Sequence, residues 1–318
     1  MTKTGLVYED RTCALPGCAV VFTPLRRNQK FCCPAHGSQH ANARRTLHGL
    51  EAVFMQPRKF ETYPVKLQED EKVIIVNDLQ MPFHSIPVLE AVEKFWNDWQ
   101  PDLEIYNGDI LDYYEISDHD KNPSRLTNLQ AEIDIGRLWV ERRVEAVPNA
   151  RRVWIDGNHE DRMRRWLWRH DPALSSLRAL ALPTLLGLDE YKMQYLMYGS
   201  RVDILGFLVE HGHRVSGGAV YSNGVAALNA RDKGSSGMAG HSHRLEAFHF
   251  TDSRGSHTYY SNGCLCIQAL EYKAFPNWQH GFSYGVAHKG QLHIVQVTIY
   301  PTGFRAEGEF YPILKGGK

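Results

Sequence analysis

The chain has 318 residues, 43% of them hydrophobic, so it can bury a large core as one domain or as a domain with an appendage. The formal net charge is zero and the pI is near 7.3, so bulk charge does not indicate a nucleic-acid partner. The first residues lack the apolar region of a secretory signal, and the most apolar stretch, residues 177–188, is too short and too interrupted to span a membrane. We therefore expect a soluble cytoplasmic protein.

The first feature along the chain is a cysteine cluster. Four of the six cysteines lie within residues 13–33, and clustered cysteines in a cytosolic chain indicate a metal site before a disulfide. The predicted ligands of a structural Zn²⁺ are Cys13, Cys18, Cys32 and His36, with Cys33 or His40 as possible substitutes. Residues 13–36 resemble small treble-clef or ribbon zinc modules, but with four residues between the first two cysteines and a histidine as fourth ligand. The alternative is a disordered tail with spare thiols.

Three zones divide the chain. Residues 1–48 form the predicted zinc module, residues 49–70 a connector, and residues 71–318 a large domain. Residues 1–60 hold nine Lys and Arg against three Asp and Glu, a local charge of +6. This basic charge beside a zinc module is the only feature of the sequence that points toward DNA or RNA.

From residue 71 on, strand-like and helix-like patterns alternate. The predicted strands are residues 72–78, 103–109, 151–159, 203–213 and a run ending at 239–243, with helical spacing of apolar residues over 86–99 and, less regularly, 126–144. Residues 257–270 and 291–301 predict added β structure. Nearly continuous apolar strands that alternate with helices indicate a layered α/β (α+β) fold.

Each predicted strand ends in residues that can bind a metal. These residues are Asp78, Asp109, Asn158 with His159, His211 with His213, and His241 with His243. Taken singly, each has an ordinary explanation as a turn, helix-capping or loop residue. Together they mark the carboxyl ends of strands, where sites form in α/β sheets. Carboxylate, amide and imidazole ligands suit Mn²⁺, Fe²⁺ or Zn²⁺, and their number predicts two ions that share a carboxylate.

The motifs D-x-Q, G-D, G-N-H-E, H-G-H and G-H-S-H, in this order over residues 72–243, resemble those of the calcineurin-like metallophosphoesterase superfamily. Residues 78–84 also resemble a phage- and prophage-type branch, which usually has histidine where this chain has Gln80. The resemblance implies a four-layer α/β/β/α sandwich with two β-sheets between helices.

The resemblance also implies a role for each motif residue. Asp78 and His243 would hold the first ion, and Asp109 would bridge both. The second ion would be held by Asn158, His211 and His241. His159 would act either as general acid for the leaving group or as an orienting donor to a phosphate oxygen. The nucleophile would be a metal-bound hydroxide.

Gln80 is the main departure from the motifs. Its amide oxygen can bind a hard ion, but it is neutral and a poorer ligand than imidazole toward zinc or iron, so we expect a weaker first site that favours Mn²⁺ or Mg²⁺. His84 is a doubtful replacement for the missing histidine ligand and is instead a candidate for binding the substrate. Arg162 and Arg165 are candidates for binding a phosphate-rich substrate, with a solvated helix face as the alternative. We interpret Glu160 as a residue of the first turn of a helix, where its negative charge interacts favourably with the helix dipole.

These features predict a metal-dependent hydrolase of phosphoester bonds, in particular a phosphodiesterase or nuclease-like enzyme acting on nucleic acid or nucleotides with Mn²⁺ and, as alternatives, Fe, Zn or Mg. A second hypothesis is a phosphomonoesterase or protein phosphatase. A third is a non-catalytic module that binds nucleic acid or protein and retains a degenerate metal site.

Overall fold

The chain forms two compact units, Met1–Lys59 and Phe60–Lys318. A computed structural model describes residues 8–40, 60–122, 128–212, 226–227, 230, 234–268 and 276–314. The larger unit begins ahead of residue 71, because strand β3 (Thr62–Val65) pairs in parallel with a strand of its second sheet. The end of the stretch that we predict as a connector therefore belongs to the larger unit.

The first sheet of the larger unit is a mainly parallel sheet of six strands in the order β14-β13-β4-β5-β6-β7. Its strands are β4 (Lys72–Val76), β5 (Leu103–Asn107), β6 (Arg151–Ile155), β7 (Gln194–Leu196), β13 (Gly281–His288) and β14 (Gln291–Thr298). β4 to β7 pair in parallel, while β13 runs antiparallel to both β4 and β14. The carboxyl ends of β4, β5 and β6 therefore lie at one edge.

The second sheet also has six strands, in the order β11-β12-β10-β9-β8-β3. Besides β3, its strands are β8 (Arg201–Ile204), β9 (Phe207–Glu210), β10 (Gly237–Ala239), β11 (Leu245–Asp252) and β12 (Gly255–Asn262). β10 lies between β9 and β12 and is parallel to both. The ends of β9 and β10, which carry the predicted histidines, are thus neighbours.

The prediction of one strand over residues 203–213 is wrong, because the chain reverses within this run. β8 and β9 pair antiparallel around Leu205 and Gly206, which adopt positive φ angles of 54° and 85°. Asp203 Oδ1 accepts a hydrogen bond from the Gly206 N–H at 2.7 Å and closes the turn. The turn carries an apolar leucine, so the apolar pattern runs across it without a break.

The helices form where apolar residues recur at helical spacing. They are α2 (Ile86–Trp99), α3 (Leu129–Ala146), α4 (Glu160–His170) and α5 (Leu182–Leu186), with short 3₁₀ helices η1 (Tyr114–Ile116), η2 (Leu174–Ser176) and η3 (Arg178–Leu180). α2 begins and ends where its apolar pattern does. α3 starts after Asn128, whose side chain accepts from the Ala131 N–H at 2.8 Å as an N-cap; Leu126 of the predicted helix lies outside the described residues. In the described part of the chain, no helix combines the length and apolar character that crossing a membrane requires.

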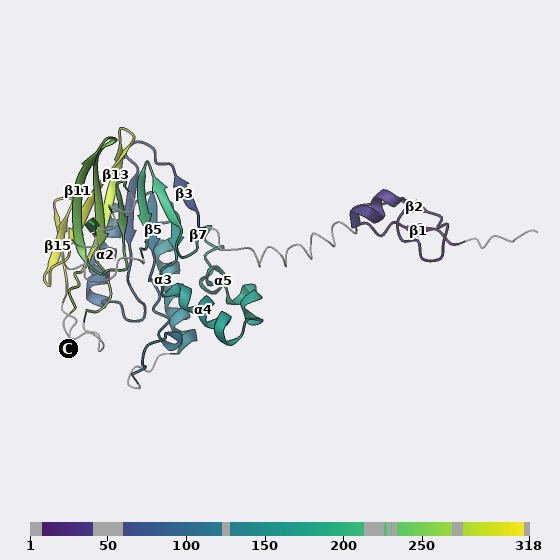
Figure 1. Ribbon diagram of the computed structural model, residues 1–318, viewed down its shortest axis with the longest axis horizontal. Helices are drawn as coiled ribbons and strands as arrows, with labels where there is room; N and C mark the ends of the chain where they lie inside the picture. The colour runs from purple at the N-terminus through teal and green to yellow at the C-terminus, as the bar shows by residue number, and fades with distance from the viewer. Residues whose placement is uncertain are drawn as a thin grey trace, which may run out of the picture. The chain divides into compact units, whose positions relative to one another are not determined.

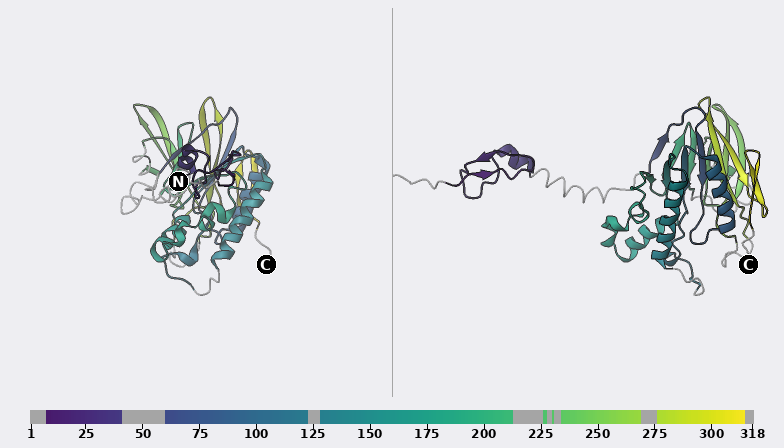
Figure 2. Two further views of the ribbon diagram at one scale, coloured as in Figure 1. Left: turned by 90° about the vertical axis from the view of Figure 1, so that its right-hand side faces the viewer. Right: turned by 180° about the vertical axis from the view of Figure 1, so that it is seen from behind.

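The layers follow from the alternation of side chains along the strands. Ile74 packs with α2 and α3 on one face of the first sheet, and Ile75 packs on the other face, between the two sheets. Helices α2 and α3 lie on the same face of the first sheet (Figures 1 and 2). Trp96 of α2 and Trp139 of α3 are buried in contact, with ring centroids 6.4 Å apart. Burial of each such aromatic side chain stabilises the folded state by roughly 1.5–3 kcal/mol.

The outer face of the second sheet carries a smaller cluster that includes Ala230, from a helical segment, and Tyr259. The larger unit is therefore a four-layer α/β/β/α sandwich, which confirms the predicted fold class. A hairpin of β15 (Gly303–Ala306) and β16 (Glu309–Pro312) completes it and packs against α2. The smaller unit contains β1 (Arg11–Thr12), β2 (Val21–Phe22) and helical residues 34–40.

Candidate metal centre

Residues from four strand ends line one cavity of about 610 Å³ in the larger unit. The cavity is lined by the predicted metal ligands Gln80, Asp109, Asn158, His241 and His243 and by the predicted catalytic residue His159. The strands β4, β5 and β6 supply the first part of this set, and β10 of the second sheet supplies His241 and His243. His211, which follows β9, does not line the cavity but contacts Asp109. The two sheets therefore meet at this edge, and each sheet supplies part of the candidate ligand set.

Asp109 is at the centre of the first group of candidate ligands. Its Oδ2 lies 3.2 Å from His211 Nε2, which in turn lies 3.2 Å from Asn158 Oδ1. One ligand atom each from Asp109, His211 and His241 lie within 4.8 Å of one another. This group contains the four residues expected to hold the second ion.

The orientation of His211 is set by the strand beside it. His211 Nδ1 lies 2.8 Å from the backbone oxygen of Asn107 and donates to it, which leaves Nε2 as the nitrogen that faces Asp109. Burial lowers the pKa of His211, but the Asp109 carboxylate outweighs this effect and raises it to about 10. The buried Asp109 carboxylate thus stabilises a positive charge beside it.

Asp78 and His243 form the second group of candidate ligands, which is expected to hold the first ion. His243 Nε2 lies 3.1 Å from Asp78 Oδ1 and 3.2 Å from the side-chain nitrogen of Gln80. All three side chains are buried, and the other ring nitrogen of His243 lies 3.8 Å from Cys266 Sγ. Again the carboxylate outweighs burial and raises the pKa of the histidine, to about 10. Gln80 therefore occupies the place at which a histidine ligand was expected.

A buried amide network holds Asp78 in place. Asn77 donates its side-chain N–H to Asp78 Oδ2 at 2.5 Å and to the Gly263 oxygen at 2.8 Å, and it accepts from Asn262 at 2.7 Å. The backbone N–H of His241 donates to the same Asp78 oxygen at 2.8 Å, which links the two groups of ligands. Neither Asn77 nor Asn262 is among the site residues predicted from the sequence; the polar residue before the strand-end aspartate was the available signal for Asn77.

The backbone is strained at these positions. The φ angles of the predicted ligands are positive, between 52° and 65°, at Asp78, Gln80, Asp109, His241 and His243. Such conformations are uncommon outside glycine and concentrate at functional sites. Gly157 is required for a related reason, because a Cβ at this position would lie 2.1 Å from Asp109 Oδ1. The local chain is thus shaped around the two aspartates.

Glu160 is a third residue whose role could not be predicted from the sequence. Its buried carboxylate accepts four backbone N–H groups, from Asp109, Ile110, Leu111 and Gly157, at 2.7–2.9 Å. Burial and the nearby Asp109 charge raise the pKa of Glu160, while these hydrogen bonds oppose the rise. Glu160 ties the loop after β5 to the loop after β6, in addition to standing in the first turn of α4.

His159 belongs to a polar triad on the cavity wall. Its Nδ1 lies 2.6 Å from Asp112 Oδ1, and its Nε2 lies 2.9 Å from a guanidinium nitrogen of Arg162. Arg162 also donates to the Asp112 backbone oxygen at 2.6 Å. His159 is itself anchored by its backbone N–H, which donates to Asp109 Oδ1 at 2.9 Å. The triad presents a histidine and a cation to the cavity beside the shared carboxylate.

The residues present fit divalent cations. Asp78 Oδ1 is buried and accepts no hydrogen bond from the described residues. Buried polar atoms normally have a hydrogen-bond partner or bind an ion, so this carboxylate oxygen is available to a cation. Carboxylate and amide oxygens lie beside imidazole nitrogens, and His211 and His243 direct Nε2 toward the aspartates, as at metal sites of mixed oxygen and nitrogen ligands. Among the described residues of the larger unit, the ligand set supports positions for two ions.

Two of the predicted substrate-binding residues lie away from this cavity. His84 is half-buried, its backbone forms a β-bridge with Cys266, and it does not line the cavity. Arg165 is exposed on α4 and does not line the cavity either. Arg162 does line it. His213, considered as a neighbour of the His211 ligand, lies outside the described residues.

Comparisons with known proteins give distant likenesses. No protein-family model matches the chain. The gene 54 protein of Mycobacterium phage D29 is 25% identical over 261 residues, which cover 76% of this chain and 99% of that protein. The gene 54 protein of Mycobacterium phage L5 is 25% identical over 231 residues, covering 67% and 88%.

Among solved structures, vacuolar protein sorting 29 from Cryptosporidium parvum has a TM-score of 0.41 and 12% identity, covering 76% of this chain and 95% of its own. A dimetal phosphatase from Danio rerio has a TM-score of 0.36 and 14% identity, covering 73% and 99%. Likenesses at this distance do not identify an activity, so the function rests on the site itself.

Proposed function

We propose that the larger unit is a metal-dependent phosphoesterase of the calcineurin-like type that uses two divalent ions, with Mn²⁺ as the preferred metal. The observation that carries the proposal is that Asp78 and Asp109 each face a histidine, and that Asp109 and His243 line one cavity. When bound, such ions neutralise phosphate charge and activate water for attack at phosphorus.

The ligands divide into two sets around the aspartates. Asp78, His243 and the Gln80 amide would hold one ion, and Asn158, His211 and His241 the other, with Asp109 between them. Gln80 presents its nitrogen to His243 in the present orientation, and a half-turn of the amide would present its oxygen instead. Glu160 and Asn77 would keep both carboxylates in position through the hydrogen bonds described above.

His159 and Arg162 would act on the substrate. Both line the cavity beside Asp109, and Asp112 fixes the His159 ring through Nδ1. The Asp112 carboxylate lies 2.6 Å from His159 Nδ1, and Nε2 faces the Arg162 guanidinium. A phosphate oxygen that binds the Arg162 guanidinium would release Nε2, which would then take up a proton from water. The resulting imidazolium, beside the Asp112 carboxylate, would pass that proton to the leaving oxygen.

The cavity wall supports an organic diester, such as a nucleotide or a nucleic-acid strand, as substrate. Phe83, Tyr114 and Trp278 line the cavity, and aromatic faces stack on bases with about 1–3 kcal/mol per base. Lys121 lies in the same wall and adds positive charge. A phosphomonoester or phosphoprotein substrate has no such need for several aromatic rings, so we place it second.

The test compares a generic diester and a generic monoester, bis(p-nitrophenyl) phosphate and p-nitrophenyl phosphate, with Mn²⁺ added to metal-free full-length protein. We expect hydrolysis of the diester at the higher rate. The Asp109→Asn variant should lose at least about 100-fold in kcat/KM and one or more bound ions by elemental analysis, because it loses the shared ligand.

Asp98→Asn, which removes an exposed carboxylate that pairs with Lys94 and contacts Tyr311, is the matched control and should behave as the parent protein. Unchanged metal content and rate in Asp109→Asn would overturn the two-ion proposal. A protein that binds no ion in the larger unit and hydrolyses neither ester would support the non-catalytic alternative. A higher rate on the monoester would move the activity to the phosphomonoesterase class.

A further inference from the structure

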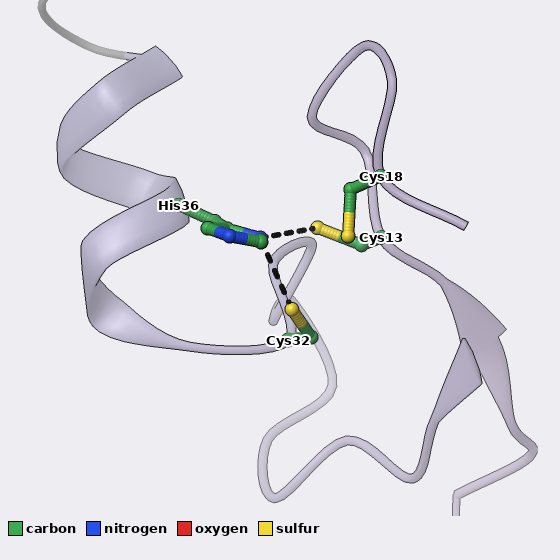
Figure 3. A group of neighbouring side chains, drawn as sticks. All are labelled: Cys13, Cys18, Cys32 and His36. Carbon is green, nitrogen blue, oxygen red and sulfur yellow. Dashed lines mark hydrogen bonds between the residues drawn. The ribbon is translucent and has the colours of Figure 1, made fainter. Parts of the chain in front are cut away.

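The smaller unit carries a group of side chains that the proposed phosphoesterase site does not use. Cys13, Cys18, Cys32 and His36 each direct a ligand atom to one point, and these atoms lie within 4.8 Å of one another (Figure 3). We propose that this unit is held together by one structural Zn²⁺ bound by three thiolates and His36 Nδ1.

The distances match a tetrahedral site. His36 Nδ1 lies 3.6 Å from Cys13 Sγ and 3.2 Å from Cys32 Sγ. With Zn–S near 2.3 Å and Zn–N near 2.0–2.1 Å, two ligands on a tetrahedron are separated by about 3.6 Å. Figure 3 shows the imidazole entering from the helical segment and the thiols facing it from two other segments. The arrangement is that of a closed site.

The local backbone positions the first two thiols despite their unusual spacing. The Cys18 N–H donates to the Leu15 oxygen at 3.0 Å, and Gly17 adopts a φ of 83°, so the four intervening residues form a tight turn. The Cys13 N–H donates to the Val20 oxygen at 2.9 Å and joins this turn to β1 and β2. The longer loop between Cys13 and Cys18 is therefore compact and holds the two thiols close together.

The smaller unit has almost no hydrophobic core among its described residues. Over residues 8–40 the buried residues are Cys13 and Pro24, while Val21 is 60% and Leu25 87% exposed. A segment with so little apolar burial cannot offset the conformational entropy of folding. In small zinc-dependent modules, binding of a structural zinc ion supplies that free energy.

The geometry also separates the ligands from their neighbours. Cys33 is half-buried and does not belong to the group, and the ring of His40 packs on Phe31 with centroids 5.0 Å apart. Both residues thus serve as matched controls for Cys32 and His36. The same comparison distinguishes zinc binding from a disulfide, because a disulfide would not need His36.

The test uses full-length protein in which Co²⁺ replaces the native metal, since thiolate-bound Co²⁺ gives a charge-transfer band in the near ultraviolet that oxygen and nitrogen ligands do not give. We expect the band in the parent, in Cys33→Ser and in His40→Asn. We expect its loss in Cys32→Ser and His36→Ala. In His36→Cys the band should persist and grow by about a third, because a fourth thiolate replaces the imidazole.

Zinc content measured in parallel should fall by one ion per chain in Cys32→Ser and stay unchanged in Cys33→Ser. Hydrolysis of the diester should be the same in all these variants, which shows that the larger unit remains folded and keeps this test independent of the proposed function. Cys264 and Cys266 lie near His243, so a Cys264→Ser/Cys266→Ser variant is included. The proposal fails if the parent shows no band, or if the band survives in Cys32→Ser and disappears in that double variant.

Discussion

The side-chain carboxylate of Glu160 accepts a hydrogen bond from the backbone N–H of Asp109 at 2.9 Å, although the two residues lie 51 positions apart. Its two oxygens also accept from Ile110, Leu111 and Gly157, so one buried side chain holds the loops after β5 and β6 at a constant separation. Asp109 thereby reaches the facing histidines with its side chain free to bind an ion.

Replacing Glu160 with glutamine should disturb this arrangement. The amide nitrogen would face backbone N–H groups, leaving two or more buried donors without an acceptor at about 1–3 kcal/mol each. We expect Glu160→Gln to lower the free energy of unfolding by about 2–5 kcal/mol and to weaken Mn²⁺ binding. Urea unfolding and Mn²⁺ titration calorimetry measure the two effects. Glu90→Gln, on the exposed face of α2, is the control; equal stability in both variants would refute this role.

The pair formed by Asp112 and His159 predicts a kinetic effect without loss of metal. Asp112→Asn removes the charged acceptor 2.6 Å from His159 Nδ1 and a partner of Arg162, so the ring loses its fixed orientation. We expect kcat to fall by about 10–100-fold with the ion content unchanged, as for other residues that orient a functional histidine. Asp120→Asn, on the same rim, should change kcat less than about threefold. Loss of ions in Asp112→Asn would contradict this assignment.

Gln80 predicts the metal preference. An imidazole in place of the amide, 3.2 Å from His243 Nε2, offers a stronger ligand to zinc and iron than to manganese. We therefore expect Gln80→His to tighten Zn²⁺ binding by about tenfold or more and Mn²⁺ binding by less, with both affinities measured by competition titration. If neither affinity nor preference changes, Gln80 is not a ligand.

Glu132 predicts a pH dependence of stability that is separate from the metal ligands. Its buried carboxyl accepts from the backbone N–H groups of Tyr113 and Tyr114, and burial raises its pKa from 4.5 to about 8. Because the folded state holds this proton more tightly, the resulting stability is complete below pH 4.5 and is lost as the pH rises through 8.

In Glu132→Gln this pH-dependent contribution should vanish, so the fall in unfolding midpoint between about pH 5 and about pH 8 should be smaller than in the parent. Thermal unfolding at both pH values measures the difference. Glu145→Gln, an exposed position on the same helix, should retain the parental slope. Equal slopes in the parent and Glu132→Gln would show that Glu132 is ionised in the folded protein throughout this range.

The sequence alone was sufficient to predict the strand ends and the residue types at them. A continuous apolar run followed by Asp78 or Asp109 is a local pattern, and local patterns determine where a strand stops and which polar side chain follows. The helix over 86–99 could be predicted for the same reason. The close grouping of Cys13, Cys18, Cys32 and His36 could also be predicted, because all four residues lie within one short stretch of the chain.

Tertiary structure decided what no local pattern contains. The pairing of β9 with β10 brings His211 beside His241, and the packing of the two sheets brings both to Asp109. The four backbone donors to Glu160 come from two loops that meet only because β5 and β6 are neighbours. The turn at Leu205 was hidden because its side chain is apolar, and there the backbone geometry and the Asp203 hydrogen bond outweighed the apolar pattern. Long-range pairing and burial set these contacts, and they depend on the whole core.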